Sequence, residues 1–307
     1  MSWLPLESNP DVLNDYMHSL GLSHRHICVD VLGFEDELLA FVPQPVHAIF
    51  LLYPWDGVNF NPDTLSKDSS ILFVDQDPEI GQACGTIAVL NALGSKEESL
   101  KFREDSFFTR FFERMKNVPA GQRGKEVMKD KELENSHSNA AKEGQTAPPN
   151  EDEFVTTHFI SFIEKNGRLI QLDGLKPGPV DLGACPKDGL LNSSVKEIQK
   201  MIEKSKDQTN FGIIALVDNE DYQPEDDEKE KEKEKEKERE EEEEGEGEGE
   251  GEEEEEEEEE KEEENKDNND NESTKDKIEG EKSSSIQASK TFEKEDDEEQ
   301  EDLAPDH

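Results

Sequence analysis

The chain has 307 residues, and its 80 acidic against 34 basic residues give a formal net charge of −46. The excess is uneven, because residues 219–307 hold 46 of the acidic and 13 of the basic residues. We therefore expect 219–307 to be a disordered acidic tail rich in Glu and Lys, since so charged a segment cannot bury a core. Its sign disfavours nucleic acid as a partner, and the longest apolar run, 46–53, is shorter than the about 18 residues of a membrane helix.

Residues 1–218 have the apolar patterns of a folded domain. In chain order, these patterns predict a helix at 10–20, a strand at 27–32, a short helix at 35–41, strands at 46–53 and 71–74, helices at 82–94, 106–116 and 121–134, strands at 154–164 and 168–172, a helix at 191–204 and a strand at 211–217. Strands interleaved with helices predict a layered α/β or α+β domain.

Two local signals stand out within this pattern. Asn166-Gly167 is the signature of a type I′ turn, so the strands on either side of it are expected to form a hairpin. Residues 135–153 are rich in small, polar and charged residues, which predicts a long structureless segment inside the domain.

Three residues have the chemistry of a thiol hydrolase. Cys84 lies in the first turn of the predicted helix at 82–94, His158 lies on the first strand of the hairpin, and Asp173 follows its second strand. A thiol attacks as the thiolate, an imidazole can take its proton, and a carboxylate can fix the imidazole tautomer. We therefore interpret Cys84 as nucleophile, His158 as base and Asp173 as the group that orients the base.

The sequence around these residues resembles that of the ubiquitin carboxyl-terminal hydrolases, small papain-like cysteine peptidases. The matching segments are Trp3-Leu4-Pro5-Leu6-Glu7, Val29-Asp30-Val31, Ala83-Cys84-Gly85-Thr86, Glu143-Gly144-Gln145-Thr146, His158-Phe159-Ile160, Leu172-Asp173-Gly174 and Ile213-Ile214-Ala215-Leu216. The resemblance implies a catalytic domain over 1–218, with a central, mainly antiparallel sheet flanked by helices and a knotted chain path. It also implies a deubiquitinating thiol hydrolase that cleaves small or unfolded adducts from the C-terminal glycine of ubiquitin through an acyl-enzyme.

The chain departs from the family at the oxyanion donor. The family has a glutamine six residues before the nucleophile, whereas this chain has Pro78, which offers neither a side-chain donor nor an N–H. Gln76 matches the expected position if two residues are inserted before Cys84, and Gln82 replaces an asparagine usual in the family. We take Gln76 as the oxyanion donor and keep Gln82 as the alternative, with a loop across 77–80 absorbing the insertion.

Substrate contacts are implied by the resemblance alone. It places the residues Leu4, Pro5, Leu6 and Glu7 against ubiquitin, and it places the 135–153 segment over the active site, where it would admit only small or unfolded leaving groups. The segment at 4–7 has a simpler explanation, in which the N-terminus is only fastened to the core.

The remaining expectations concern partners and location. Cys28, Cys185 and the histidines other than His158 are interpreted as structural or surface residues, and the chemistry needs no cofactor or metal. We expect a monomer in the cytoplasm, with the nucleus as a second compartment. Two other functions stay open: a ubiquitin-binding protein with impaired catalysis, and a hydrolase of a related modifier such as Nedd8. Three roles of the tail stay open. It could be a solvated segment without a partner, it could bind basic proteins such as histones, or it could compete within the molecule for a basic surface.

Overall fold

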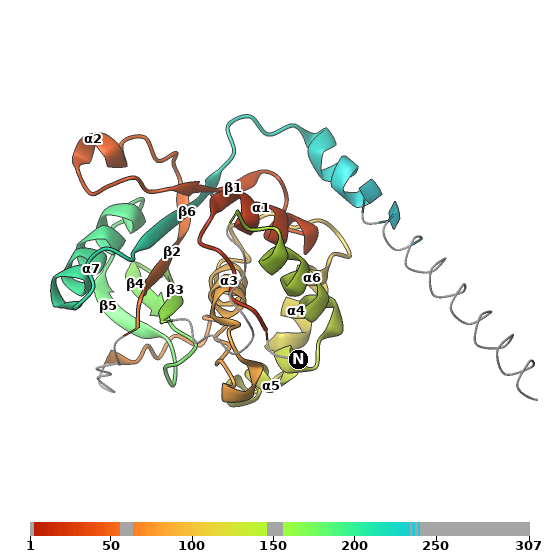
Figure 1. The fold of residues 1–307 in the computed structure, drawn as a ribbon, viewed down its shortest axis with the longest axis horizontal. Helices are drawn as coiled ribbons and strands as arrows, with labels where there is room; N and C mark the ends of the chain where they lie inside the picture. The colour runs from red at the N-terminus through yellow and green to blue at the C-terminus, as the bar shows by residue number, and fades with distance from the viewer. Residues whose placement is uncertain (1–2, 56–63, 146–155, 234, 237–238, 240–307) are drawn as a thin grey trace, which may run out of the picture. The chain divides into compact units, whose positions relative to one another are not determined.

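The core of the molecule is one six-stranded sheet, with strand order β1-β6-β2-β3-β4-β5. The computed structural model describes residues 3–55, 64–145, 156–233, 235–236 and 239 (Figure 1). All neighbouring strands pair antiparallel, which confirms the predicted mainly antiparallel sheet. The strands are β1 (His26–Asp30), β2 (Val46–Pro54), β3 (Thr157–Lys165), β4 (Arg168–Leu172), β5 (Val180–Ala184) and β6 (Gly212–Asp218).

Helices cover both faces of this sheet (Figure 1). One apolar cluster joins the sheet to α1, α3, α4 and α6, and a second joins its other face to α2 and α7. The helices are α1 (Pro10–Ser19), α2 (Asp36–Leu39), α3 (Cys84–Ser95), α4 (Phe107–Lys116), α5 (Arg123–Met128), α6 (Lys131–Lys142) and α7 (Leu190–Lys204), with 3-10 turns η2 (Pro78–Ile80) and η3 (Ala120–Gln122).

The continuous apolar run at 48–53 of β2 reflects burial on both faces of the strand. Because side chains alternate along a strand, Phe50 lies in the first cluster while Ile49 and Leu51 lie in the second. β2 is flanked by β6 and β3, so it has no exposed edge.

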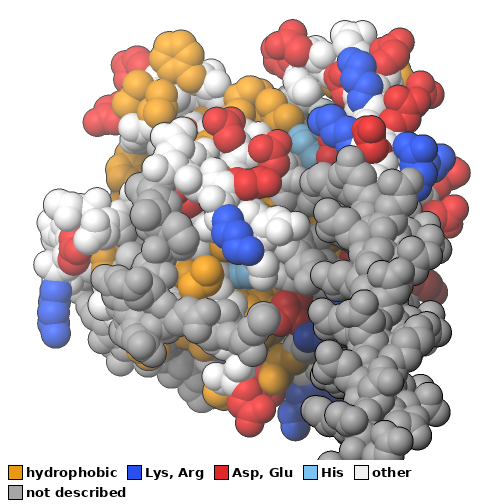
Figure 2. Space-filling model, turned by 45° about the vertical axis from the view of Figure 1, so that its right-hand side comes forward, with side chains coloured by type: hydrophobic (Ala, Val, Ile, Leu, Met, Phe, Trp, Pro, Cys, Tyr) orange, Lys and Arg blue, Asp and Glu red, His pale blue; other side chains and the backbone are white. Residues whose placement is uncertain are grey.

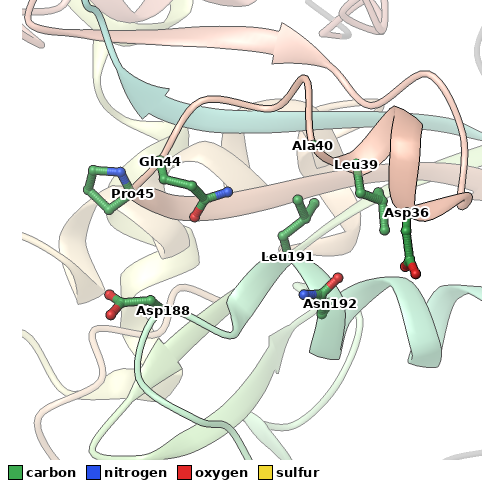
Figure 3. Close-up of a pocket in the computed structure, with 8 residues that line it drawn as sticks. All are labelled: Asp36, Leu39, Ala40, Gln44, Pro45, Asp188, Leu191 and Asn192. Carbon is green, nitrogen blue, oxygen red and sulfur yellow. The ribbon is translucent and has the colours of Figure 1, made fainter.

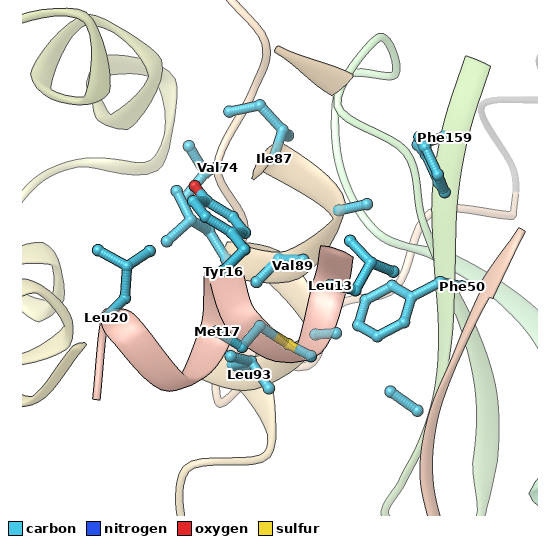
Figure 4. Packing of buried hydrophobic residues seen from close by; sticks show 14 of the residues in the cluster. Leu13, Tyr16, Met17, Leu20, Phe50, Val74, Ile87, Val89, Leu93 and Phe159 are labelled. Atoms are coloured by element: carbon cyan, nitrogen blue, oxygen red, sulfur yellow. The ribbon is translucent and has the colours of Figure 1, made fainter. Parts of the chain in front are cut away.

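Helix α3 is the central helix of the first cluster, and all of its residues are buried. It packs on β3, and α1 packs beside it. Figure 4 shows Tyr16 and Met17 of α1 close to Val89 and Leu93 of α3. Cys84, at the start of α3, is therefore carried by a helix that is packed on every side.

The predicted hairpin is confirmed. β3 and β4 pair across Asn166 and Gly167, which have φ angles of 51° and 75°. Two consecutive positive φ values are those of a type I′ turn, whose twist matches that of the strands. The turn brings the strand that carries His158 alongside the strand that ends before Asp173.

The strand predicted at 71–74 is wrong. This segment is buried and outside the sheet, and side chains of α3 bond its backbone. Asn91 Oδ1 accepts from the Val74 N–H at 2.6 Å, Asn91 Nδ2 donates to the Val74 carbonyl at 3.0 Å, and Ser95 Oγ donates to the Leu72 carbonyl at 3.1 Å. These bonds satisfy polar groups that a sheet ladder would otherwise satisfy.

The chain between α4 and the hairpin also differs from the prediction. The single helix predicted at 121–134 is η3, α5 and α6, and Asp130 caps α6 by accepting from the Leu133 N–H at 3.2 Å. Because α6 continues to Lys142, the structureless segment predicted from 135 is wrong over 135–142. Its part at 146–153 lies outside the described residues. Strand β5 was not predicted.

The described chain continues beyond the expected boundary at 218. Residues 224–233 are helical, and Asp227 reaches back to the turn before β1. Its carboxylate accepts from Ser23 Oγ at 2.6 Å and from the His24 N–H at 2.7 Å, while Tyr222 Oη donates to it at 3.0 Å. The Arg25 guanidinium lies 5.1 Å from the Tyr222 ring centre. The start of the acidic extension is thus fastened to the domain by polar contacts.

These contacts predict different stabilities for two truncated chains. A chain ending at 240 is expected to keep the melting temperature of the full chain, since it retains Asp227. A chain ending at 218 loses several hydrogen bonds to a carboxylate, together about 2 kcal/mol, and should melt about 4 to 8 °C lower. Calorimetry of the two chains checks this, and equal melting temperatures would show that the Asp227 contacts contribute nothing.

The surface of the domain carries both signs of charge. On the face shown in Figure 2, Lys and Arg side chains are interspersed with Asp and Glu. No single-sign patch of described residues dominates this face.

Candidate active site

Cys84 is the first residue of α3, after the N-cap Ala83. The first N–H groups of a helix have no intrahelical acceptor, and the helix dipole favours negative charge there, so this position suits a thiolate. The residue retains 9% of its surface, against 3% each for Cys28 and Cys185. The two other cysteines are packed in the apolar clusters, where burial raises their pKa values. Both are inert thiols in this arrangement.

The structure brings the three predicted residues together. His158 lies near the start of β3, and its Nε2–H donates to Asp173 Oδ1 at 2.8 Å. The Cys84 side chain forms a hydrogen bond with the same imidazole. Because Nε2 is occupied by Asp173, Nδ1 is the nitrogen left to face the thiol. The arrangement is that of nucleophile, base and orienting carboxylate.

Asp173 is held rigidly beside the base. It is fully buried directly after β4, and its Oδ1 also accepts from the Leu175 N–H at 3.1 Å. The bond from the Leu175 N–H fixes the Asp173 carboxylate, and the carboxylate in turn fixes the plane of the His158 imidazole.

The electrostatics of the site favour a charged imidazole. Burial alone would lower the pKa of His158, but its hydrogen bonds to Asp173 and Cys84 and the charges of these groups outweigh burial and raise it to about 9. His158 is therefore an imidazolium at neutral pH, which suits a thiolate–imidazolium pair.

Gln76 lies between the Asp173 loop and the start of α3. Its backbone N–H donates to the Gly174 carbonyl at 2.9 Å, and its side-chain amide donates to the Gly81 carbonyl at 3.0 Å. The segment expected to absorb the insertion, 77–80, contains the 3-10 turn η2, and the N-cap Asp77 accepts from the Glu79 N–H at 3.0 Å. An amide nitrogen carries two hydrogens, so Gln76 keeps a second one beyond the bond to Gly81.

Gln82, the alternative donor, is on the same stretch of chain. Its backbone N–H donates to the Trp3 carbonyl at 3.2 Å, so the N-terminal segment runs directly beside the approach to Cys84. Trp3 and Gly81 form an isolated parallel bridge there.

The segment predicted to face ubiquitin is fastened to the core. The side chain of Leu6 is buried, and Gly85 packs so closely against it that a Cβ at Gly85 would lie 3.2 Å from Leu6. Leu6 is therefore a core residue beside the nucleophile, and its contact with substrate stays a prediction. Leu4, Pro5 and Glu7 are partly exposed.

A hollow of about 830 Å³ lies between the segment that carries α2 and the start of α7 (Figure 3). It contains none of the residues that the sequence singled out, so it is separate from the catalytic candidates. Its lining residues are Asp36, Leu39, Ala40, Gln44, Pro45, Asp188, Leu191 and Asn192.

One group within the described part of the chain has metal-ligand side chains close together. The ligand atoms of His26, His47 and Asp218 lie within 4.8 Å of one another. However, the Lys101 N–H donates to His26 Nε2 at 3.0 Å, so Nδ1 carries the proton of the neutral ring and faces Asp218 at 2.9 Å. A protonated nitrogen cannot ligate a metal, so this arrangement is a His–Asp–His cluster rather than a metal site.

Sequence reasoning missed one set of residues around Cys84. His137, which the sequence suggested to be structural or surface, is fully buried and joined by hydrogen bonds to Thr86 and to the Leu4 carbonyl. Its spacing from Cys84 has no local signature, because α6 meets α3 only in the folded chain.

Comparison with known proteins adds to this geometry. Residues 3–203 match the family described as ubiquitin carboxyl-terminal hydrolase, family 1. Ubiquitin carboxyl-terminal hydrolase 3 of Arabidopsis thaliana is 40% identical over 231 residues, covering 70% of this chain and 93% of the relative. The ubiquitin carboxyl-terminal hydrolase of Aplysia californica is 37% identical over 206 residues, covering 66% and 95%. Isozyme L1 of Rattus norvegicus is 31% identical over 224 residues, covering 70% and 98%.

A solved structure has the same fold. The catalytic domain of UCH37 from Trichinella spiralis, bound to ubiquitin vinyl methyl ester, matches with a TM-score of 0.56 and 19% identity. The match covers 72% of this chain and 97% of that domain.

Proposed function

The chain belongs to the ubiquitin carboxyl-terminal hydrolases of family 1 and is a cysteine-type deubiquitinating hydrolase, and we propose that it cleaves small or unfolded adducts from the C-terminal glycine of ubiquitin. The observation that carries the proposal is that Cys84, at the N-terminus of a buried helix, lies together with His158 of β3 and with Asp173 directly after β4.

The reaction proceeds in two steps. The Cys84 thiolate attacks the carbonyl carbon of the terminal glycine, and the His158 imidazolium gives its proton to the leaving group as the bond to the adduct breaks. Neutral His158 then takes a proton from water, which attacks the thioester and releases ubiquitin and free Cys84. Asp173 holds the imidazole in the required orientation through both steps.

The tetrahedral oxyanion needs donors that are already in place. The Cys84 N–H, in the first turn of α3, has no acceptor within the helix. We choose the second hydrogen of the Gln76 amide as the other donor to the oxyanion. The first hydrogen is bonded to the carbonyl of Gly81, which is three residues before Cys84, and this bond fixes the amide close to the nucleophile.

Gln76→Ala is accordingly expected to lower kcat for a ubiquitin C-terminal fluorogenic substrate by about 10²- to 10³-fold. Gln82→Ala should cost much less, because its side chain is assigned no role at the oxyanion. Turnover of the two variants on the same substrate makes the comparison. A large loss for Gln82→Ala with none for Gln76→Ala would transfer the role to Gln82.

Ubiquitin is the proposed modifier, since the relatives are named for it and the UCH37 structure holds it. Matched fluorogenic derivatives of ubiquitin and Nedd8 test this choice, and we expect faster turnover of ubiquitin. The alternative of a ubiquitin-binding protein with impaired catalysis predicts near-zero turnover with intact binding, and the aligned triad argues against it. We further propose that the protein acts as a monomer in the cytoplasm, with the nucleus as a second compartment.

A further inference from the structure

A chain of hydrogen bonds runs through the core behind the nucleophile. Tyr16 Oη lies 2.7 Å from Thr86 Oγ1, Thr86 Oγ1 lies 2.8 Å from His137 Nδ1, and His137 Nε2 lies 2.5 Å from the Leu4 carbonyl oxygen. The three side chains are at most 2% exposed. Residues from α1, α3, α6 and the N-terminal segment thus meet at one point.

The donor and the acceptor in each of these three hydrogen bonds follow from the Leu4 carbonyl at the end of the series. A carbonyl oxygen can only accept, so His137 Nε2 carries the proton and Nδ1 has a free lone pair. Thr86 must then donate to Nδ1, and Tyr16 must donate to Thr86. Burial lowers the pKa of His137 to about 4, despite its bond to Leu4, so the ring is neutral and in one tautomer at neutral pH.

The network joins two parts of the active site. Thr86 is two residues after Cys84, in the first turn of α3. Leu4 belongs to the segment whose Trp3 carbonyl accepts from the Gln82 N–H, two residues before Cys84. The Trp3 ring also lies 4.6 Å from the His137 ring, centre to centre. His137 therefore connects the chain on both sides of the nucleophile.

Core packing alone does not require this polar group. An apolar side chain of similar volume would fill the space, whereas a buried imidazole is tolerated only because each of its nitrogens is paired. Loss of the imidazole would leave the Thr86 hydroxyl without its acceptor and the Leu4 carbonyl without its donor. Such a fully paired network specifies one geometry more sharply than apolar contacts do.

We propose that His137 is a positioning residue for Cys84: through Thr86 and the Leu4 carbonyl, it fixes the first turn of α3 against the N-terminal segment, and so holds the thiol in register with His158. The proposal deepens the proposed function and rests on it for turnover. Its central claim concerns the Cys84–His158 pair, which can be measured without ubiquitin.

The test is the pH dependence of Cys84 alkylation by iodoacetamide in the full chain, located by mass spectrometry. The wild-type thiol, paired with an imidazolium, should react at pH values where a free thiol is slow. His137→Leu should slow alkylation at neutral pH by about 10- to 100-fold and move the profile towards that of a free thiol. His137→Gln, which offers an amide donor and a carbonyl acceptor, should restore much of the rate.

Two further variants separate positioning from stability. Leu133→Ala removes a fully buried side chain from the same helix, so it should lower the melting temperature while leaving the alkylation profile unchanged. Thr86→Val deletes the hydroxyl at nearly constant volume, and it should reproduce the His137→Leu profile even if His137→Leu fails to fold.

The outcomes are distinct. A wild-type alkylation profile in Thr86→Val or His137→Leu, or an equal loss in Leu133→Ala, would overturn the positioning role. A profile that responds to the network in an enzyme without ubiquitin turnover would support the positioning role and reject the proposed function.

Discussion

Cys84→Ala is expected to reduce hydrolysis of a ubiquitin C-terminal fluorogenic substrate by about 10⁵-fold or more, because no covalent intermediate can form without the thiol. Ubiquitin binding should persist with a similar dissociation constant. The thiol is largely buried and offers little area for non-covalent contact. Steady-state kinetics and calorimetric titration with ubiquitin measure the two quantities on the same preparation.

The two other cysteines are the matched controls. Cys28→Ala and Cys185→Ala remove buried thiols from the apolar clusters, so each should lower stability modestly and leave kcat nearly unchanged. If Cys28→Ala abolished turnover while Cys84→Ala retained it, the nucleophile would have been assigned to the wrong residue.

His158→Ala is expected to cost nearly as much as Cys84→Ala, since members of a catalytic unit fail together. Asp173→Asn should be milder, with a loss of about 10³- to 10⁴-fold, because the base remains while its orientation and charge partner are altered. Turnover of the two variants on one substrate measures this order. Equal activity of Asp173→Asn and wild type would remove Asp173 from the site.

The same variant changes the pH profile in a defined direction. With the pKa of His158 at about 9, kcat/KM of the wild type should fall as pH rises through about 9, where the imidazolium loses its proton. Asp173→Asn removes the negative partner, so this limb should move to lower pH. Because the pKa of His158 in the folded chain lies above the ordinary histidine value of 6.5, its protonation stabilises the fold fully below pH 6.5, and this contribution is lost as pH rises towards 9.

Features with a local cause were predictable from the sequence. Asn166-Gly167 specified its turn, and the unbroken apolar run at 46–53 indicated a strand buried on both faces. The positions of Cys84, His158 and Asp173 followed from three short motifs, and the fold brings all three together.

Features that depend on contacts between residues far apart in the sequence were not predictable. The segment at 71–74 has the composition of a strand, but Asn91 and Ser95 satisfy its backbone from a helix that lies later in the chain. Strand β5 is short and mostly half-exposed, so its pattern is weak. The burial of His137 depends on how α6 meets α3, and no periodicity along the chain encodes it.

The most direct test of the account is to react the full chain with ubiquitin vinyl methyl ester and to locate the bond by mass spectrometry. The probe places an electrophile where the scissile carbonyl would lie, so only a correctly positioned nucleophile is captured. We predict one adduct per chain, on Cys84, formed faster than with the corresponding Nedd8 probe and absent in Cys84→Ala. An adduct on Cys28 or Cys185, or no adduct with a folded wild-type chain, would contradict it.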